Sequence, residues 1–195
     1  MTNRTSALPV DPLFLDRWSP RSFDGSAMKR DQLMTILEAG RWAPSAFNYQ
    51  PWRFLFSMRG DAHWGEFLNL LIPFNAGWAR DASALVFVVS DEKMRSERGD
   101  KPSHSHSFDA GSAWGFMALQ AHKMGFATHG MTGLEFDKCA EGLALPDGFR
   151  VEAAFVVGLQ GDAALLPEGL RERELPSDRK PLDQIAMNGP FSKPD

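Results

Sequence analysis

The hydrophobic positions between residues 29 and 42 recur with the spacing of a helix. Four of them fall at i, i+3, i+4 and i+7 and predict one buried stripe: Leu33, Ile36, Leu37 and Gly40. Pro44 cannot extend this helix, because its ring occupies the place of a helical N–H. Residues 52–58 then alternate between apolar and polar and predict a strand, which a turn at residues 59–61 ends.

Two later segments have the composition of buried elements. The apolar, β-branched run at residues 85–89 predicts a central strand that is covered on both faces. Residues 108–124 form the longest predicted helix, which Gly125 ends, and its many small residues predict a central or interface helix. The other predicted elements are helices at 11–17, 62–71 (ended by Pro73), 78–83 and 137–144, strands at 127–129 and 151–159, an exposed loop at 92–107 and a loop at 130–133.

The final stretch, residues 162–195, has little periodicity and is rich in proline and charge. Alone it could not bury enough apolar surface to fold, yet it contains Leu165, Leu166, Leu170, Leu175, Leu182 and Ile185. We therefore expect it to lie along another surface, such as that of a partner subunit. The whole chain, residues 1–195, is predicted to be a single α+β domain with several helices around a small sheet.

Composition narrows the class of protein. Apolar residues make up 43% and charged residues 24% of the chain, which is typical of a soluble globular protein. The net charge of −4 argues against nucleic acid as the main partner, because phosphate neutralisation needs a basic face. The longest apolar run, residues 84–89, is too short to span a membrane, and no signal-peptide pattern opens the sequence. We expect a cytoplasmic enzyme or binding protein.

Several common site chemistries find no support in the sequence. Cys139 is the single cysteine, which excludes an internal disulfide, and we expect it to be a partly buried thiol and not a nucleophile. His104 and His106 fit no zinc spacing, even with Asp100 and Asp109 nearby, so we expect no metal site. The sequence has no Gly-x-Gly-x-x-Gly after a strand and no Gly-x-Ser-x-Gly elbow.

Two basic segments could bind a phosphate. In the turn at residues 17–23, Arg17 and Arg21 flank Ser19, and an arginine fork with a serine hydroxyl matches phosphate oxygens. Arg21 could instead face the pyrimidine edge of a flavin. Near the C-terminus, Arg179 and Lys180 could complete a dianion site. The alternative is that all these cations are solvated, those of the turn complementing a helix dipole.

Two loops offer polar groups to a flat ring. Ser45, Asn48 and Gln50 lie between an apolar helix and an apolar strand, and their side chains suit contacts to a polar ring such as a flavin. The glycines of residues 130–133 expose backbone amides that could bond the same ring. The alternative for the first loop is an ordinary connector with its amides in water.

Together these segments resemble the nitroreductase family of FMN-dependent oxidoreductases over nearly the whole chain. The shared motifs are Arg-x-Ser-x-Arg-x-Phe at 17–23, Ala-Pro-Ser-x-x-Asn-x-Gln-Pro-Trp-x-Phe at 43–54, a small-residue helix ending at 120–125, a Thr-x-Gly loop, a Pro-x-Gly before the last strand and a basic-Pro-Leu tail. The resemblance implies a helix-rich, three-layer α/β/α fold with a small mixed, mostly antiparallel sheet. It also implies an intertwined homodimer with shared active sites, in which the tail wraps the partner.

The resemblance further implies a cofactor, a reaction and a set of contacts. FMN would pass hydride from NAD(P)H through its N5 to a small electron-poor acceptor, such as a nitroaromatic, quinone or activated alkene, in a ping-pong reaction without a catalytic side chain or a metal. The residues that would contact FMN are Arg17, Trp18, Ser19, Arg21, Pro44, Ser45, Ala46, Asn48, His129, Gly130, Met131 and Arg179. Those of the loop at 44–48 would come from the partner subunit.

The sequence departs from the family pattern at two places. Asn75 matches an asparagine that contacts the cofactor in many members, but Trp78 stands where they place a lysine. A substrate-covering insertion would be reduced to residues 92–107. Other readings stay open: reductive dehalogenation, breakdown of the flavin, a flavin-binding protein without activity, or a cofactor-free domain that dimerises through its small-residue helix.

Overall fold

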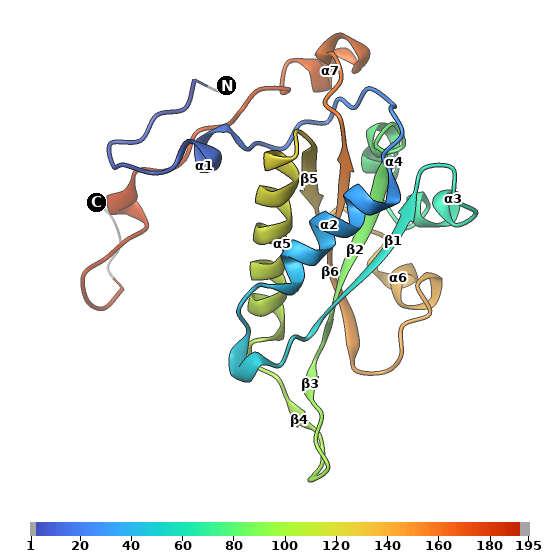
Figure 1. Ribbon diagram of the computed structural model, residues 1–195, viewed down its shortest axis with the longest axis vertical. Helices are drawn as coiled ribbons and strands as arrows, with labels where there is room; N and C mark the ends of the chain where they lie inside the picture. Colours follow the sequence, from blue (N-terminus) through green and yellow to red (C-terminus); the bar gives the residue numbers. More distant parts are fainter. Residues whose placement is uncertain (1–2, 192–195) are drawn as a thin grey trace.

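The central sheet has four strands in the order β1-β2-β6-β5, and every neighbouring pair in it is antiparallel. The computed structural model describes residues 3–191 (Figure 1). The strands of this sheet are β1 Trp52–Met58, β2 Ala84–Asp91, β5 Ala127–Met131 and β6 Phe149–Gly158. The predicted small, mostly antiparallel sheet is therefore confirmed.

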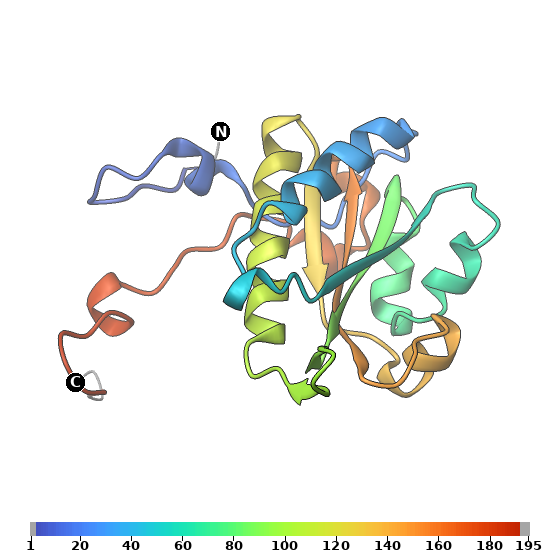
Figure 2. The same cartoon turned by 60° about the horizontal axis from the view of Figure 1, so that its bottom comes forward.

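Helices cover both faces of this sheet, which gives the expected three layers (Figure 2). On one face lie α2 (Arg30–Arg41) and α5 (His106–Lys123). On the other lie α3 (Trp64–Leu68), α4 (Pro73–Ala79) and α6 (Phe136–Gly142). Because side chains alternate along a strand, β2 supplies Val86 to the first core and Phe87 to the second. Every residue of β2 is buried, as predicted for a central strand.

The predicted stripe of α2 is confirmed, since its buried residues are Leu33, Ile36, Leu37 and Gly40. Gly40 is where α2 approaches its neighbours most closely. A Cβ added there would stand 2.7 Å from Cγ of Met117 on α5 and 3.2 Å from Cζ of Phe54 on β1. The absence of a side chain at this position lets the two helices and the strand meet.

The prediction for residues 62–83 was wrong in its division into helices. Pro73 does not end a helix but begins α4, at a position where a missing N–H costs no helical hydrogen bond. The preceding helix, α3, is shorter than predicted and ends at Leu68. The predicted helix at 78–83 is the last part of α4, followed by a turn that leads into β2.

Two predicted loops contain strand structure. The segment at 92–107 forms a small exposed hairpin of β3 (Lys93–Met94) and β4 (Lys101–Pro102) and then enters α5 at His106. Gly130 and Met131, predicted to lie in a loop, are the last residues of β5, because they continue the pairing with β6. The prediction from residue type alone missed this pairing, which is a long-range contact.

A β-bulge interrupts the pairing of β2 with β6. Val88 pairs with Ala153 and Val89 pairs with Val151, so Glu152 is an extra residue on β6. A bulge places two successive side chains on the same face of a sheet. Glu152 is thereby turned, together with Ala153, toward the face that α5 covers.

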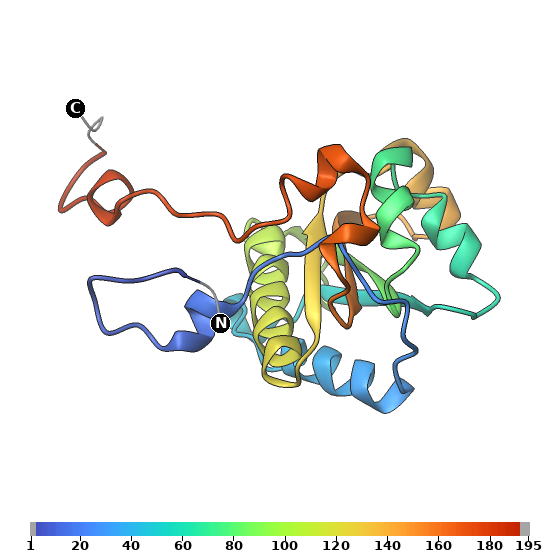
Figure 3. The same cartoon turned by 90° about the horizontal axis from the view of Figure 1, so that it is seen from above.

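The segment after β6 divides into two parts. Its first part packs on its own chain: Leu166 joins the core beneath α4, and the short helix α7 (Glu168–Arg171) follows. Beyond about residue 177 the chain leaves the body on the side where the N-terminal arm and α1 (Pro12–Asp16) also project (Figure 3). Leu182 and Ile185 are exposed there, and so is Leu175 just before residue 177. A covering partner for this arm stays a prediction.

Candidate functional site

A cavity of about 720 Å³ lies against the α5 face of the sheet, beside the end of β5. The turn after α1 closes one end of it, and the bulge of β6 lies at its other end. Its wall is built largely from small residues of α5 and from backbone of β5 and β6. The lining residues are Phe14, Arg17, Ser19, Val88, Ser107, Ala110, Gly111, Trp114, Gly115, Ala118, Leu119, Gly130, Met131, Thr132, Glu152, Ala153, Ala154 and Phe155.

Gly130 gives the cavity part of its shape. A Cβ at this position would stand 2.9 Å from the ring of Trp114, which lies directly against the strand. Any larger residue would therefore push the indole away from β5. Gly111 and Gly115 of α5 have no atom of another residue within 4 Å of an added Cβ, so they leave open space on the cavity side.

Three arginines converge at the cationic end of the cavity. Arg17 donates a hydrogen bond of 3.2 Å to Oγ of Ser19. Arg4, from the N-terminal arm, donates 3.0 Å to the carbonyl of Arg17 and 3.3 Å to that of Leu15. The third, Arg179, comes from the C-terminal arm and bonds carbonyls in its own turn.

The pKa values of Arg17 and Arg4 are both lowered, by burial and in part by neighbouring positive charge. Burial lowers the pKa of Arg17, and the charges of Arg179 and Arg4 lower it further. Burial and the charge of Arg179 lower the pKa of Arg4, and the charge of Asp178 partly offsets this lowering. Nε of Arg4 is buried and has no partner among the described residues. Clustered cations with a free donor are stabilised by an anion, and phosphate fits an arginine fork.

Arg21 takes its position from the chain segment after β6. Its backbone N–H and that of Ser22 donate to Oε1 of Glu174, at 2.6 and 2.8 Å. Glu174 is buried, and the hydroxyl of Ser22 bonds the carbonyl of Asp162. The arginine turn is thus fixed from two sides by residues that follow the last strand.

His129 and Trp78 lie together beside this turn. Nδ1 of His129 donates 2.9 Å to the carbonyl of Pro20, and its ring centroid is 4.7 Å from that of Trp78. Burial lowers the pKa of His129, and the charges of Arg21 and Arg17 act in the same direction, so the imidazole is neutral at pH 7. Nε1 of Trp78 is buried without a partner in the described chain, and Asn75 donates to the carbonyl of Gly133.

The loop that contains Pro44, Ser45, Ala46 and Asn48 does not reach the cavity of its own chain. It lies at the N-terminal end of α5, where the backbone N–H of Ala46 donates 3.2 Å to the buried carboxylate of Asp109. Its φ angles at Phe47 (53°) and Asn48 (55°) are left-handed. For phenylalanine this backbone is strained, and its side chain is 93% exposed.

The structure brings together only part of the predicted contact set. Arg17, Ser19, Gly130 and Met131 line the cavity. Trp18 lines a neighbouring pocket of about 590 Å³ with Thr128 and Gln160. The positions that lie near the cavity without lining it are Arg21, His129 and Arg179, and the set at 44–48 is separate from it.

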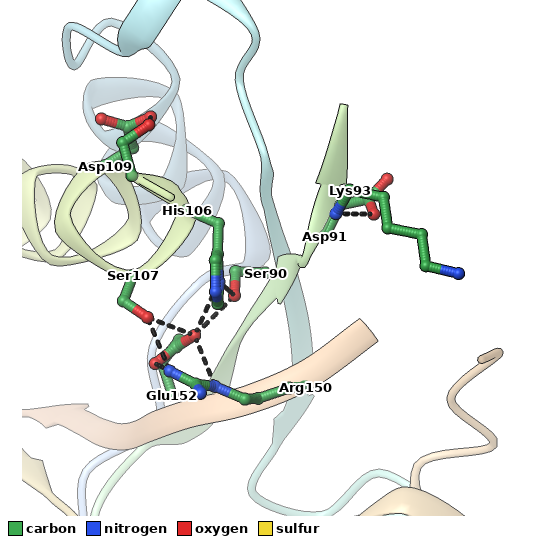
Figure 4. A network of polar contacts seen from close by, with 9 residues as sticks. Ser90, Asp91, Lys93, His106, Ser107, Asp109, Arg150 and Glu152 are labelled. Carbon is green, nitrogen blue, oxygen red and sulfur yellow. Dashed lines mark hydrogen bonds and ion pairs between the residues drawn. The ribbon is translucent and has the colours of Figure 1, made fainter. Parts of the chain in front are cut away.

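The opposite end of the cavity carries a polar network centred on Glu152 (Figure 4). Its Oε1 accepts hydrogen bonds from Ser90 (2.6 Å), Ser107 (3.0 Å) and Nε of Arg150 (3.1 Å). Nη2 of Arg150 donates to Oε2 at 3.0 Å. Nδ1 of His106 lies 2.8 Å from Oγ of Ser90 and 3.3 Å from Oε1 of Glu152. The bulge of β6 makes this meeting possible.

Arg4, Glu174 and the Glu152 network were missed by the sequence analysis. Arg4 and Glu174 lie in segments without periodicity, so nothing in the sequence around them indicated a partner.

No cluster of potential metal ligands is found among residues 3–191: no three His, Cys, Asp or Glu side chains lie close enough together to hold a metal ion. Cys139 is buried, and its pKa is raised by burial and by Glu135, as befits an unreactive thiol.

The fold and the cavity define a three-layer α+β protein with an arginine-containing turn beside a glycine-walled cavity. The family model described as "Nitroreductase family" matches residues 15–63 and 71–159, more than half of the chain. The chain belongs to the nitroreductase family. In the described residues no helix has the length and apolar character needed to cross a membrane.

Individual relatives support this assignment. A solved structure described as "the oxidoreductase containing FMN" is 50% identical, with a TM-score of 0.97, covering 100% of this chain and 98% of that one. A nitroreductase family protein from Streptococcus pneumoniae TIGR4 shares the fold at 20% identity, with a TM-score of 0.73, covering 91% and 98%. An "uncharacterized 15.4 kDa protein in ask 5'region" of Mycolicibacterium smegmatis is 31% identical over 150 residues, covering 73% of this chain and 99% of its own.

Proposed function

We propose that this protein is an FMN-dependent oxidoreductase that uses NAD(P)H to reduce a small electron-poor acceptor. The observation that carries the proposal is the convergence of Arg4, Arg17 and Arg179 beside a cavity whose wall is the backbone at Gly130 and Met131. Half of the residues are identical in a structure that contains FMN. The class of acceptor, nitroaromatic, quinone or activated alkene, comes from the family resemblance alone.

The described residues fit FMN at both ends of the molecule. A phosphate at Arg17, Ser19 and Arg179 would relieve the mutual repulsion that lowers the arginine pKa values, and Nε of Arg4 is a further free donor. At the ring end, Gly130 and Met131 line the cavity, and their backbone groups would contact the ring. The unpaired Nε of Arg4 is a costly buried donor that an anion would satisfy.

Bound FMN would supply the redox chemistry, a hydride transfer from NAD(P)H to an electron-poor acceptor. The side chains bind and orient. Arg21 would stabilise negative charge at the pyrimidine edge electrostatically. His129, held neutral by burial and oriented by Pro20, adds no charge of its own at neutral pH. Trp114 closes the cavity against β5.

The second subunit is part of this proposal. The loop at Pro44, Ser45, Ala46 and Asn48 would border the cofactor of a partner, since it contributes nothing to the cavity of its own chain. Phe47 projects from the same loop almost fully exposed, and strained backbone that persists is typical of functional sites. The arm after residue 177 would lie on the partner. Cytoplasmic location and the lack of a nucleic-acid role stay predictions.

The absorbance spectrum of the purified protein tests the proposal. We expect a flavin band that bleaches when NADH or NADPH is added without oxygen and returns when 1,4-benzoquinone follows. If the protein is colourless and its thermal stability does not change when FMN is added, FMN is not its cofactor. A yellow protein that neither nucleotide bleaches would point to a flavin-binding protein without this activity.

A further inference from the structure

The cavity has one carboxyl group in its lining, that of Glu152. Arg17 is the other lining residue with an ionisable side chain. Arginine keeps its proton in proteins because its pKa lies above 12. Reduction of an acceptor by hydride consumes a proton as well, so a proton source beside the cavity matters to the reaction.

Glu152 is connected to His106 by hydrogen bonds whose donor order is fixed. The hydroxyl of Ser90 donates to Oε1 of Glu152 at 2.6 Å. Its oxygen is therefore the acceptor toward His106, so Nδ1 of His106 carries the proton that bridges their 2.8 Å contact. Ser90 is fully buried and His106 is partly exposed, so the path runs from the protein surface through a dry contact to the cavity.

The bulge of β6 is what places Glu152 on this path. In a regular strand only one of the residues 152 and 153 would face α5, whereas the bulge turns both to that side. Bulges are frequent beside active sites, where they re-aim a side chain. Four donor contacts from Ser90, Ser107 and Arg150 then hold the carboxylate in one orientation.

We propose that Glu152 delivers a proton to the acceptor in the cavity and that His106 replaces it through Ser90. This inference rests on the proposed function. NAD(P)H is oxidised and loses a hydride, and the acceptor is reduced by gaining that hydride and one proton. Glu152, which is ionised at rest, takes the hydroxyl proton of Ser90, Ser90 takes the Nδ1 proton of His106, and His106 takes one from water. The O–H bond formed on Glu152 then breaks as the acceptor is protonated.

The charges around the network keep Glu152 ionised at rest. Burial by itself would raise the pKa of Glu152, but hydrogen bonds from Arg150, Ser90 and Ser107 together bring it below its usual value. The nearby carboxylates are engaged elsewhere: Asp91 pairs with Arg95, and Asp109 accepts from Ser105 and Ala46. Glu152 therefore holds a proton only while it passes to the acceptor.

Glu152→Gln in the FMN-loaded protein separates proton delivery from electron transfer. We expect anaerobic reduction by NADH within about twofold of wild type, because that step needs no proton from the network. Reoxidation by 1,4-benzoquinone should slow by at least about tenfold, in the range of general acid catalysis. Reoxidation by ferricyanide, which takes electrons without protons, should stay within about twofold. Glu66→Gln, which removes the exposed carboxylate paired with His63, is the matched control and should change none of these rates.

The outcomes of these measurements distinguish a failure of the proton relay from a failure of the proposed function. Benzoquinone reoxidation at the wild-type rate overturns the relay, and so does an equal slowing with both oxidants, which would indicate a general structural effect. A wild-type protein that NADH and NADPH do not bleach overturns the proposed function itself, independently of the variant. His106→Phe is the second variant: it keeps the carboxylate and Ser90 but removes the group that replaces the proton, so the benzoquinone rate should fall while the ferricyanide rate holds.

The flavin-free protein offers a readout that does not involve activity. Nitrogen-15 NMR identifies which imidazole nitrogen of His106 carries the proton when the ring is uncharged. The proposed donor order requires the Nδ1–H form in the wild-type protein. The Nε2–H form would reverse the bond to Ser90, leave that hydroxyl unable to donate to Glu152 at the same time, and overturn the relay.

Discussion

The backbone N–H of Arg21 donates a hydrogen bond of 2.6 Å to the carboxylate of Glu174, which lies 153 positions further along the chain. The same oxygen accepts from the next N–H, of Ser22. One buried side chain thereby holds the backbone of the arginine turn. The segment after β6, whatever its role toward a partner, first serves the site of its own chain.

Replacing Glu174 should therefore weaken both stability and cofactor binding. Glu174→Ala leaves two backbone N–H groups without their acceptor, which costs on the order of 1–3 kcal/mol for each buried donor that stays unpaired. Chemical denaturation of the flavin-free protein measures the first effect and fluorescence titration with FMN the second. Glu172→Ala, two positions away and exposed, is the control. If Glu174→Ala changes neither the free energy of unfolding nor the dissociation constant for FMN, the turn keeps its shape without Glu174.

Arg17→Ala should weaken FMN binding. Loss of a charge-assisted hydrogen bond costs about 1.5–3 kcal/mol, which corresponds to about a 10- to 100-fold rise in the dissociation constant. Arg98→Ala removes an arginine from the exposed hairpin segment and should leave the constant unchanged. If the two variants bind FMN equally well, Arg17 does not contact the phosphate.

The buried imidazole of His129 predicts a pH dependence of stability. Its folded-state pKa is lowered, chiefly by burial, so the unfolded chain binds more protons below the unfolded value of about 6.5. Stability should be fully present above that pH and should be lost as the pH falls toward the folded-state pKa. Denaturation curves of the flavin-free protein between pH 7.5 and 5 measure this loss, which His129→Gln should reduce and His104→Gln, at an exposed position, should not.

Gly40 and Gly65 offer a matched pair of helical glycines. Alanine at Gly40 would meet Met117 at 2.7 Å, so we expect a loss of stability of about 1–3 kcal/mol from overpacking. Alanine at Gly65 meets nothing within 4 Å and should stabilise the protein by up to about 1 kcal/mol through helix propensity. Urea denaturation gives both values, and effects of the same sign would contradict the described packing.

A shared site predicts that FMN affinity depends on assembly. If the loop at residues 44–48 borders the cofactor of a partner subunit, dilution to monomer should lower the affinity for FMN. Analytical ultracentrifugation gives the range of dissociation, and FMN titrations above and below it give the comparison. A monomer that binds FMN as tightly as the concentrated protein would place the whole site within one chain.

The regular elements could be predicted because their signals are local. The stripe of α2 and the apolar run of β2 each carry their own periodicity, and both lie where the pattern predicts. Pro73 was assigned to the wrong end of a helix, since a proline signals a boundary without saying on which side the helix lies. β5 was predicted too short because its last pairs depend on β6.

The site was predictable only where residue type and chemistry coincide. The spacing of Arg17 and Ser19 predicts an anion site, and both residues line the cavity. Glu152 could not be found in this way, because its direction depends on a bulge that only the register of β6 against β2 reveals. Glu174 likewise has meaning only through a backbone contact across almost the whole chain.

The strand order β1-β2-β6-β5 constrains how the protein can fold during synthesis. Strands β1 and β2 leave the ribosome early and can pair, but the other edge of β2 waits for β6, which ends at Gly158. Until then a mostly apolar strand has one uncovered edge, a state prone to aggregation. Such distant pairings also make folding slow. We therefore expect nascent chains that stall before residue 149 to need chaperones more than chains that stall after residue 174.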